Sequence, residues 1–276
     1  MNGFFWIASY PKSGNTWLRL FLESLAAGGK PVDINALSIC GNAAVRDAFD
    51  RILDMASADL TDDEITCARP RQYEIEARHA AAPQLRKVHD SWRMTPAGEA
   101  LFPLALTQAA VYIVRDPRDV AVSLAHHMNQ TIDQTITRMN NPLSIMEAAR
   151  RRIPRQLPQF LGSWSQHVES WLDAPVKVLP VTYEAMLSEP TTTFGEIARF
   201  LGFETTSGAL ETAIKAVSFE RLRASEEANG FVEKQPVTDC FFRRGIAGGW
   251  RDSLSSAQIA RIETDHGPMM RRLGYL

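Results

Sequence analysis

An apolar run, a polar loop and an amphipathic run follow one another at the start of the chain, and this order strongly restricts its fold. Residues 3–9, GFFWIAS, are apolar almost without interruption, as in a strand that is buried on both faces. The loop YPKSG follows, and apolar residues then recur at helical spacing from Trp17 to Leu25, before Gly28 and Gly29. The pattern predicts a strand, a tight loop and a helix, which is the repeating unit of a parallel α/β sheet.

A second strand-loop-helix unit is predicted further along the chain. Residues 109–115, AAVYIVR, form another buried run, and the motif DPRD comes directly after it. Asp116 is placed to cap the next helix, Pro117 suits the first helical position, and Asp119 stands where a capping-box acid would stand. The unit therefore repeats the order seen at the start of the chain.

Further strands and helices complete the alternating order. Residues 85–92, LRKVHDSW, predict a short strand that leads into a loop, and residues 176–186, VKVLPVTYEAM, predict a third main strand. Residues 30–85 carry a mixed helical pattern, whereas residues 130–160 are polar and basic and predict an irregular excursion. Additional helices are predicted around residues 164–171, 190–201, 207–216 and 255–266.

This alternation predicts a single α/β domain over residues 1–276, in which helices flank a mainly parallel sheet. The chain has 276 residues, of which 45% are hydrophobic, so it can bury a large core, and no internal repeat divides it. In sheets of this kind, ligands bind beyond the carboxyl ends of the strands. The segments YPKSG, HDSW and RDPRD all fall at these ends, and we expect the functional site there.

Composition excludes several classes of function. The formal net charge of −2 argues against a broad electrostatic surface for nucleic acid. The three cysteines, Cys40, Cys67 and Cys240, form no CxxC pair, which is typical of reduced thiols rather than of disulfides or a zinc site. The opening MNGFFWIASYP lacks a basic n-region, and no run approaches the about 18 apolar residues of a membrane span. We therefore expect a cytoplasmic protein that binds neither nucleic acid nor membrane.

The segment YPKSGNTW has the composition of an anion-binding loop. Gly14 permits close approach of the backbone, and the amides from Ser13 to Thr16 open a helix whose N-terminus favours an anion. Lys12 adds a full positive charge. The alternative is an ordinary strand-to-helix turn with a solvated lysine. The order Gly-x-x-x-x-Gly-Lys-[Ser/Thr] is absent from the chain, which disfavours a kinase or GTPase driven by a nucleoside triphosphate.

The segment VRDPRDVAVSLAHHM offers a second place for an anion. Arg115 emerges at a strand end, and Ser123 lies eight residues later, about two helical turns away. A guanidinium fork and a hydroxyl can together hold a phosphate. Taken alone, the segment is better explained as a helix cap with a surface Arg-Asp pair.

Together, the two segments resemble the signature motifs of the sulfotransferases that use 3′-phosphoadenosine 5′-phosphosulfate (PAPS). YPKSGNTW resembles the family's 5′-phosphosulfate loop, and VRDPRDVAVS resembles its 3′-phosphate motif. Three more segments, RKVHDSW, VTYEAM and FFRRGIAGGW, follow in family order, so that the resemblance runs from residue 4 to about residue 252. It implies the P-loop-like sulfotransferase fold, PAPS as the cosubstrate, its desulfated form PAP as the product, and no metal.

The resemblance also implies which residues hold the donor. One group would cradle the 5′-phosphosulfate and place an indole near the adenine. These residues are Lys12, Ser13, Gly14, Asn15, Thr16 and Trp17. A second group would hold the 3′-phosphate and flank the base. These residues are Arg115, Ser123, Tyr183, Ser218, Phe219, Arg243, Arg244 and Gly245. Val217 and Gly249 depart from the family, which has threonine and aspartate there, and Asn15 stands where the family usually has threonine.

Catalysis by such an enzyme requires charge stabilisation and removal of a proton from the acceptor hydroxyl. Histidine is the side chain whose ordinary pKa suits a base at neutral pH. By its place in RKVHDSW, His89 is the candidate base, with Lys12 and Lys87 as cations near the transferred group. A lone histidine is otherwise more often a hydrogen-bonded structural residue. Asp90, the next residue, is expected either to orient the imidazole or to contact the acceptor.

The predicted acceptor is a small molecule with a hydroxyl group, such as a phenol, an alcohol or a natural-product scaffold. Residues 30–85, 126–160 and 225–250 are expected to shape its pocket, and His126 and His127 can line it. Two alternatives stay open: a nucleotide-dependent small-molecule kinase on a related fold, and a non-catalytic nucleotide-binding protein. The sequence makes no prediction about the oligomeric state.

Overall fold

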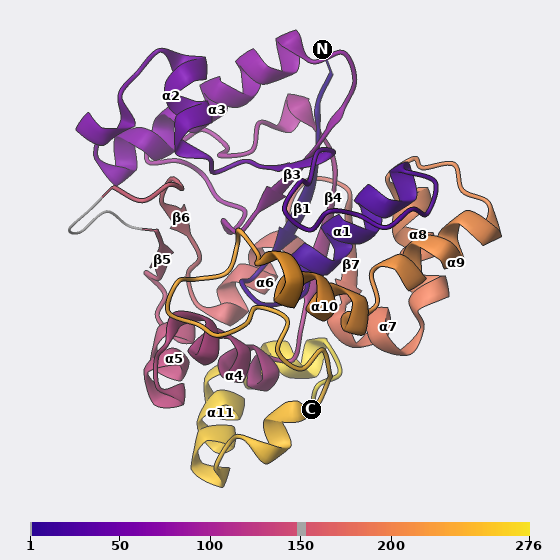
Figure 1. Cartoon of the computed structure of the whole chain (residues 1–276). Coiled ribbons are helices and arrows are strands. Elements are labelled where there is room, and N and C mark those ends of the chain that lie inside the picture. Colours follow the sequence, from indigo (N-terminus) through magenta and orange to yellow (C-terminus); the bar gives the residue numbers. More distant parts are fainter. Residues whose placement is uncertain (1, 148–152) are drawn as a thin grey trace.

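A five-stranded parallel sheet forms the centre of the protein (Figure 1). The computed structural model describes residues 2–147 and 153–276. The strands lie in the order β2-β3-β1-β4-β7, and each neighbouring pair is parallel. Their bounds are β1 (Phe4–Ser9), β2 (Cys40–Asn42), β3 (Gln84–Val88), β4 (Thr107–Val114) and β7 (Val178–Thr182). The predicted single α/β domain, with a mainly parallel sheet flanked by helices, is confirmed.

The two faces of the sheet carry separate apolar cores, because successive side chains of a strand point to opposite faces. In β1, Trp6 and Ala8 belong to one core and Ile7 belongs to the other. In β4, Tyr112 and Ile113 divide in the same way. All five side chains are fully buried, which explains why these strands read as continuous apolar runs in the sequence.

Helices cover both faces of the sheet. α1, α8, α9 and α10 supply the core that contains Ile7, and α3, α4, α5, α6 and α11 supply the core that contains Trp6. Figure 1 shows α1 beside α9, and α11 in yellow next to α4 and α5. Their bounds are α1 (Asn15–Ala26), α3 (Asp62–His79), α4 (Pro117–Met128), α5 (Ile132–Met139), α6 (Trp164–Leu172), α8 (Pro190–Phe200), α9 (Ser207–Ala216), α10 (Phe219–Asn229) and α11 (Ser256–Arg272).

The strand predicted at residues 176–186 is shorter than expected. β7 ends at Thr182, whose hydroxyl accepts a hydrogen bond of 3.1 Å from the backbone amide of Ala185. This cap starts α7 (Tyr183–Ser188), which directs the chain away from the sheet. Tyr183 therefore stands at a helix start, at the carboxyl edge of the sheet.

Residues 130–160, predicted to be irregular, contain regular structure. α5 begins with a capping box between Thr131 and Gln134, and β5 (Ile145–Met146) pairs antiparallel with β6 (Gln159–Phe160). The arginines at 150–152 lie outside the described residues. α5 has eight residues and β5 and β6 have two each, so each element is shorter than the window of about 11–18 residues over which periodicity is read.

Residues 30–85 are largely helical, as predicted. α2 (Arg46–Leu53) and α3 lie over one edge of the sheet, with a small apolar cluster of their own around Phe49 and Ile65. The edge strand β2 and the helix α10 were not predicted. α10 has a weakly amphipathic sequence, FERLRASEEAN, of which Leu222 and Glu226 are buried.

Candidate active site

Three of the predicted motifs begin next to one another at the carboxyl edge of the sheet. Ala8 pairs with Val88, and Ser9 pairs with Ile113, so that β1, β3 and β4 end at the same level. The loops after these strands border a cavity of about 1180 Å³. All but two of the predicted site residues line it. The lining ones are Lys12, Gly14, Asn15, Thr16, Trp17, Lys87, His89, Arg115, Ser123, Tyr183, Phe219, Arg243, Arg244 and Gly245.

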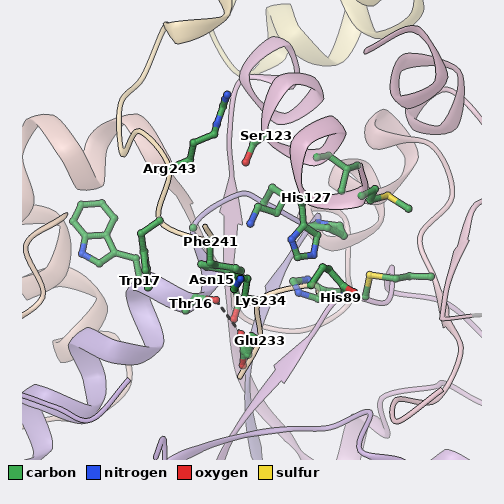
Figure 2. Close-up of a pocket in the computed structure, with 18 of the residues that line it drawn as sticks. Asn15, Thr16, Trp17, His89, Ser123, His127, Glu233, Lys234, Phe241 and Arg243 are labelled. Atoms are coloured by element: carbon green, nitrogen blue, oxygen red, sulfur yellow. Dashed lines mark hydrogen bonds between the residues drawn. The ribbon is translucent and has the colours of Figure 1, made fainter. Parts of the chain in front are cut away.

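Figure 2 shows how these side chains are distributed. As drawn, Arg243 and Ser123 lie toward the top of the cavity, and Trp17 lies on its left side. His127 lies right of the centre of the view, and His89 lies below it. The two predicted residues outside the lining are Ser13 and Ser218. Ser13 is fully buried, and its hydroxyl has no hydrogen-bond partner in the described part of the chain, whereas Ser218 is the N-cap residue of α10.

The first loop requires an unusual backbone. Lys12 and Gly14 adopt φ values of 68° and 108°, both in the left-handed region. A Cβ atom at Gly14 would stand 2.8 Å from Cδ2 of Tyr183, so a glycine is needed there for steric reasons as well. The turn leads directly into α1, whose first amides have no partner within the helix, and Gly14, Asn15 and Thr16 line the cavity.

Asn15 is the first residue of α1 and lines the cavity, but its side chain bonds the protein itself. Its Nδ2 donates to the carbonyl of Ile7 at 2.9 Å and to the hydroxyl of Ser9 at 3.3 Å. These bonds tie the start of α1 to the end of β1. The group that Asn15 offers to a ligand is therefore its backbone amide, whereas Thr16 directs its hydroxyl toward the cavity.

Arg115 joins the motifs of three separate segments. Its Nη1 donates to the carbonyl of Lys12 at 3.2 Å, and its Nη2 donates to the carbonyl of Ile246 at 2.9 Å. Its guanidinium carbon lies 4.2 Å above the ring centroid of Tyr183. The arginine of the second motif is thus in direct contact with the backbone of the first loop, and one ligand can reach both.

The sequence predicted that Asp119 acts in a capping box, and this prediction is wrong. Its carboxylate instead accepts hydrogen bonds from the backbone amides of Gly248 at 2.7 Å and Trp250 at 2.9 Å. It thereby holds the segment after the arginine pair Arg243 and Arg244 against α4. A carboxylate from α4 provides an anchor in the stretch where Gly249 replaces the aspartate of the family.

The aromatic end of the cavity is formed by Trp17, Tyr183 and Phe219. The Trp17 indole nitrogen donates to the carbonyl of Val217 at 3.0 Å, and its ring lies 5.9 Å from that of Tyr183. Val217 is fully buried, so its side chain is a packing residue rather than part of the lining. Gly245 adopts φ 61°, and a Cβ there would overlap the Phe219 ring. The glycine therefore allows the segment that carries Arg243 and Arg244 to approach this aromatic surface.

The half-buried Lys12 and the buried Lys87 place positive charge beside the first loop. Burial, together with the charges of Arg115 and Lys87, lowers the pKa of Lys12 to about 7. Burial also lowers the pKa of Lys87. The Lys12 ammonium lies 3.8 Å from the ring centroid of Phe241. Each of these cations gains from a bound anion, because an anion offsets the loss of hydration.

His89 is oriented as a base would need to be. Its Nδ1 lies 2.8 Å from the carbonyl oxygen of Ser9 and must donate to it, because a carbonyl can only accept. The neutral ring then carries its free electron pair on Nε2. Burial and the charge of Lys87 hold the pKa of His89 well below its usual value, so the ring is uncharged at neutral pH. The geometry therefore provides a proton acceptor that is ready without prior deprotonation.

Asp90 neither orients His89 nor faces an acceptor, and both expectations for it are wrong. Its carboxylate receives two hydrogen bonds of 2.8 Å from the guanidinium of Arg69, and it also accepts from the amide of Phe160. Arg69 is fully buried and bonds the Tyr73 hydroxyl as well. Asp90 thus belongs to a buried ion pair that connects the loop after β3 to α3.

This pair gives a prediction about stability. Replacing Asp90 with asparagine leaves the buried Arg69 charge without a partner, and we expect the free energy of unfolding to fall by about 3–5 kcal/mol. Arg71→Ala removes one side of an exposed ion pair with Glu74 and serves as the matched control, with an expected loss below about 1 kcal/mol. Urea unfolding measures both. Equal losses for the two variants would contradict the assigned role of Asp90.

His127 lines the cavity, as expected for the acceptor pocket, whereas Glu233 lines it without having been predicted from the sequence. Glu233 binds Arg19 at 2.7 Å and accepts a hydrogen bond of 3.2 Å from the Thr16 hydroxyl. Burial and the charges of Lys12 and Lys87 lower the pKa of His127 to about 3. Glu233 lies in a glycine-rich, polar stretch without periodicity, and therefore no local pattern could identify it.

Among residues 2–147 and 153–276, no group of three or more histidine, cysteine, aspartate or glutamate side chains could hold a metal ion. None of the described helices is long and apolar enough to cross a membrane. The three cysteines are free. The cavity therefore relies on lysines, arginines and backbone amides for its charge.

The fold and the cavity together define an α/β protein with a strand, a glycine-containing loop and a helix at the edge of the cavity. A family model described as "Sulfotransferase domain" matches residues 4–274. The chain belongs to this sulfotransferase family, as the sequence motifs predicted.

Individual relatives agree with this assignment. The chain is 26% identical over 276 residues to sulfotransferase 1A1 of the dog, Canis lupus familiaris, which covers 97% of this chain and 83% of the relative. It is 34% identical over 162 residues to cytosolic sulfotransferase 13 of Arabidopsis thaliana, covering 55% and 48% of the two chains. Among solved structures, mouse sulfotransferase SULT7A1 in complex with PAP is similar in fold, with a TM-score of 0.61, 19% identity, and coverage of 98% and 85%.

Proposed function

We propose that the protein transfers the sulfuryl group of PAPS to a hydroxyl group of a small molecule and releases PAP. The observation that carries this proposal is the bond between Arg115 and the carbonyl of Lys12. It brings the two predicted anion sites within reach of one ligand that has two phosphates. Membership of the sulfotransferase family supports the same reaction.

The residues of the cavity fit such a donor. Ser13 has a buried hydroxyl without a partner among the described residues, directly beside the amides that open α1. Lys12 and Thr16 add a cation and a hydroxyl at this end. Arg115, with Ser123 and Arg243, supplies a guanidinium-rich end suited to a second phosphate. Two anion-binding ends with an aromatic surface match the chemistry of an adenosine bisphosphate.

Catalysis would then depend on positioning and on charge. When bound, PAPS supplies an activated sulfuryl group on a phosphate leaving group. Lys12 and Lys87 are placed to stabilise the negative charge that builds up as the leaving group departs. His89, through the free electron pair on its Nε2, is placed to accept the proton of the acceptor hydroxyl. Ser9 holds the ring in this tautomer through its carbonyl oxygen.

The acceptor would occupy the part of the cavity beyond His89. The cavity residues that could face an acceptor include the apolar side chains of Met128, Met146 and Leu161, together with Arg138 and Asn42. Of the expected acceptor segments, 126–160 and 225–250 each contribute many residues to the lining of the whole cavity, whereas the described lining from 30–85 is Asn42. A small amphipathic hydroxyl compound suits such a surface. A cytoplasmic location is part of the proposal, supported by the free cysteines.

The test is transfer of labelled sulfur from PAPS to a panel of phenols, alcohols and hydroxylated natural products. The proposal expects label on at least one acceptor and release of one PAP for each transfer. A protein that binds ATP with Mg²⁺ and phosphorylates these compounds, or that binds nucleotide and transfers nothing, would overturn it. These outcomes correspond to the two alternatives that the sequence left open.

The lowered pKa of Lys12 gives a prediction about pH. An anion favours the charged ammonium, so PAP binding takes up a proton wherever free Lys12 is neutral. Because the pKa of Lys12 lies at about 7, we expect PAP affinity to fall as pH rises from 7.5 to 9. The phosphates of PAP, with second pKa values of about 6, are already ionised over this range. Calorimetry at several pH values measures how PAP affinity changes with pH. Lys12→Met should reduce this pH dependence, and an unchanged pH dependence would contradict the assignment of the proton uptake to Lys12.

A further inference from the structure

Glu233 places a carboxylate inside the donor end of the cavity. It follows α10 in a stretch without regular structure, and its side chain turns inward toward the first loop. Figure 2 shows Glu233 below Thr16, with a dashed line between the two side chains. The Thr16 hydroxyl donates to one carboxylate oxygen at 3.2 Å, and the Lys87 ammonium lies 3.7 Å from the same oxygen. The other oxygen accepts from Arg19 at 2.7 Å.

These partners give Glu233 the electrostatic environment of a bound anion. Burial alone would raise the pKa of Glu233, but the charges of Lys87 and Arg19 more than offset this effect and hold it at about 2. The carboxylate is therefore ionised at every physiological pH. Its charge also acts on Lys12 and His89, where it favours the protonated forms. Glu233 thus interacts with every group that we assign to the chemistry.

We propose that Glu233 is a built-in competitor of the donor: its carboxylate occupies the place of the donor's 5′ anion, leaves when PAPS enters, and returns as PAP departs. This inference rests on the proposed function, because it uses the assignment of Thr16 and Lys87 to the donor. Two anions cannot share these partners at low cost, since like charges at such short range repel strongly where water is scarce.

The surrounding chain allows this movement. The stretch that carries Glu233 is fixed before it by Asn35, which bonds the backbone of Gly230 and Val232. The end of the stretch, beyond Glu233, is fixed at Phe241 and Phe242, whose backbone amides donate to the carboxylate of Glu226. Between these anchors, the Glu233 side chain can leave Thr16 and Lys87 while staying near Arg19.

Such a competitor has a consequence for turnover. Product release limits many enzymes of comparable design. Because the carboxylate stays near Arg19 while PAP is bound, it repels the bound anion and competes with it for Thr16 and Lys87, which raises the dissociation rate of PAP and lowers its affinity. Glu233 would speed the departure of the product in exchange for weaker binding of the donor.

The test compares PAP binding by the wild type and by Glu233→Gln. The amide keeps the shape but lacks the charge, and we expect the dissociation constant and the dissociation rate of PAP to fall by about tenfold. Glu227→Gln is the matched control, since Glu227 is an exposed glutamate of α10 that pairs with Arg223. It changes the net charge equally and should leave PAP binding within about twofold of the wild type.

The opposite sign would overturn the inference. If Glu233 only supported the site by holding Arg19 and Lys87 in place, Glu233→Gln would weaken PAP binding. Unchanged binding in Glu233→Gln would overturn it as well, while leaving the proposed function intact. Absence of PAP binding by the wild type and both variants would instead overturn the proposed function, and this inference with it.

Discussion

We expect the substitution His89→Ala to lower turnover by about two to four orders of magnitude, with little change in PAP affinity. The ring lies at the end of β3, with Nδ1 committed to the Ser9 carbonyl and Nε2 free. His89 and His127 both line the cavity, and in His89 the bond from Nδ1 to the Ser9 carbonyl leaves Nε2 as the unprotonated nitrogen. Its loss removes the proton acceptor but leaves the anion-binding residues Lys12 and Arg115 in place.

His127→Ala is the matched control for this prediction. His127 lines the same cavity, and its ring packs edge-on against Phe241; among residues 2–147 and 153–276 it has no carbonyl partner that would fix its tautomer. We expect it to change the Michaelis constant of the acceptor more than turnover. The two variants are compared by transfer of labelled sulfur and by calorimetry with PAP. Near-normal turnover in His89→Ala, or a larger loss in His127→Ala, would assign the base elsewhere.

The second large effect is expected for Lys12→Met, which keeps most of the side-chain stem but removes the charge. Removing one group that stabilises developing charge costs about 10²–10³ in turnover. Lys12 is held beside the anion site by the left-handed turn of the loop, with its carbonyl bound by Arg115. PAP binding should weaken by a smaller factor, because Arg115, Arg243 and the backbone amides remain.

Lys234→Met provides the comparison for Lys12→Met. Lys234 also lines the cavity, but its ammonium donates to the carbonyl of Thr238, within its own stretch. We expect its replacement to lower turnover by less than about tenfold, in line with a peripheral charge. If the two lysine variants lost turnover to the same extent, the charge of Lys12 would have no special part in the reaction.

Local sequence patterns were sufficient to predict the strands, the loop and the helix that surround the site. β1, the first loop and α1 were predicted because a buried strand, a turn and an amphipathic helix each have their own periodicity. Since parallel strands end at one edge, the residues that follow β1, β3 and β4 had to meet. The contact between Lys12 and Arg115 follows from this topology and needed no knowledge of side-chain packing.

Partners distant in the sequence could not be predicted in the same way. The position of Asp119 in the sequence suits a capping residue, but its carboxylate accepts hydrogen bonds from backbone amides more than 120 residues away. Asp90 is adjacent to His89 in the sequence, yet successive side chains point in different directions and it pairs with Arg69. Glu233 reaches Thr16 across 217 positions. Each of these contacts depends on how loops pack, about which hydrophobic periodicity contains no information.

The central claim is that one adenosine bisphosphate spans the first loop and the second motif. Its most direct test is calorimetry with PAP and with adenosine 5′-phosphate, which lacks the 3′-phosphate. For the wild type we expect PAP to bind more tightly by about tenfold to a hundredfold, as for a charge-assisted hydrogen bond. Arg115→Ala should abolish this ratio, whereas Lys12→Met should weaken both ligands and preserve it. A wild type that binds the two nucleotides equally, or an Arg115→Ala variant that keeps the full ratio, would contradict the account.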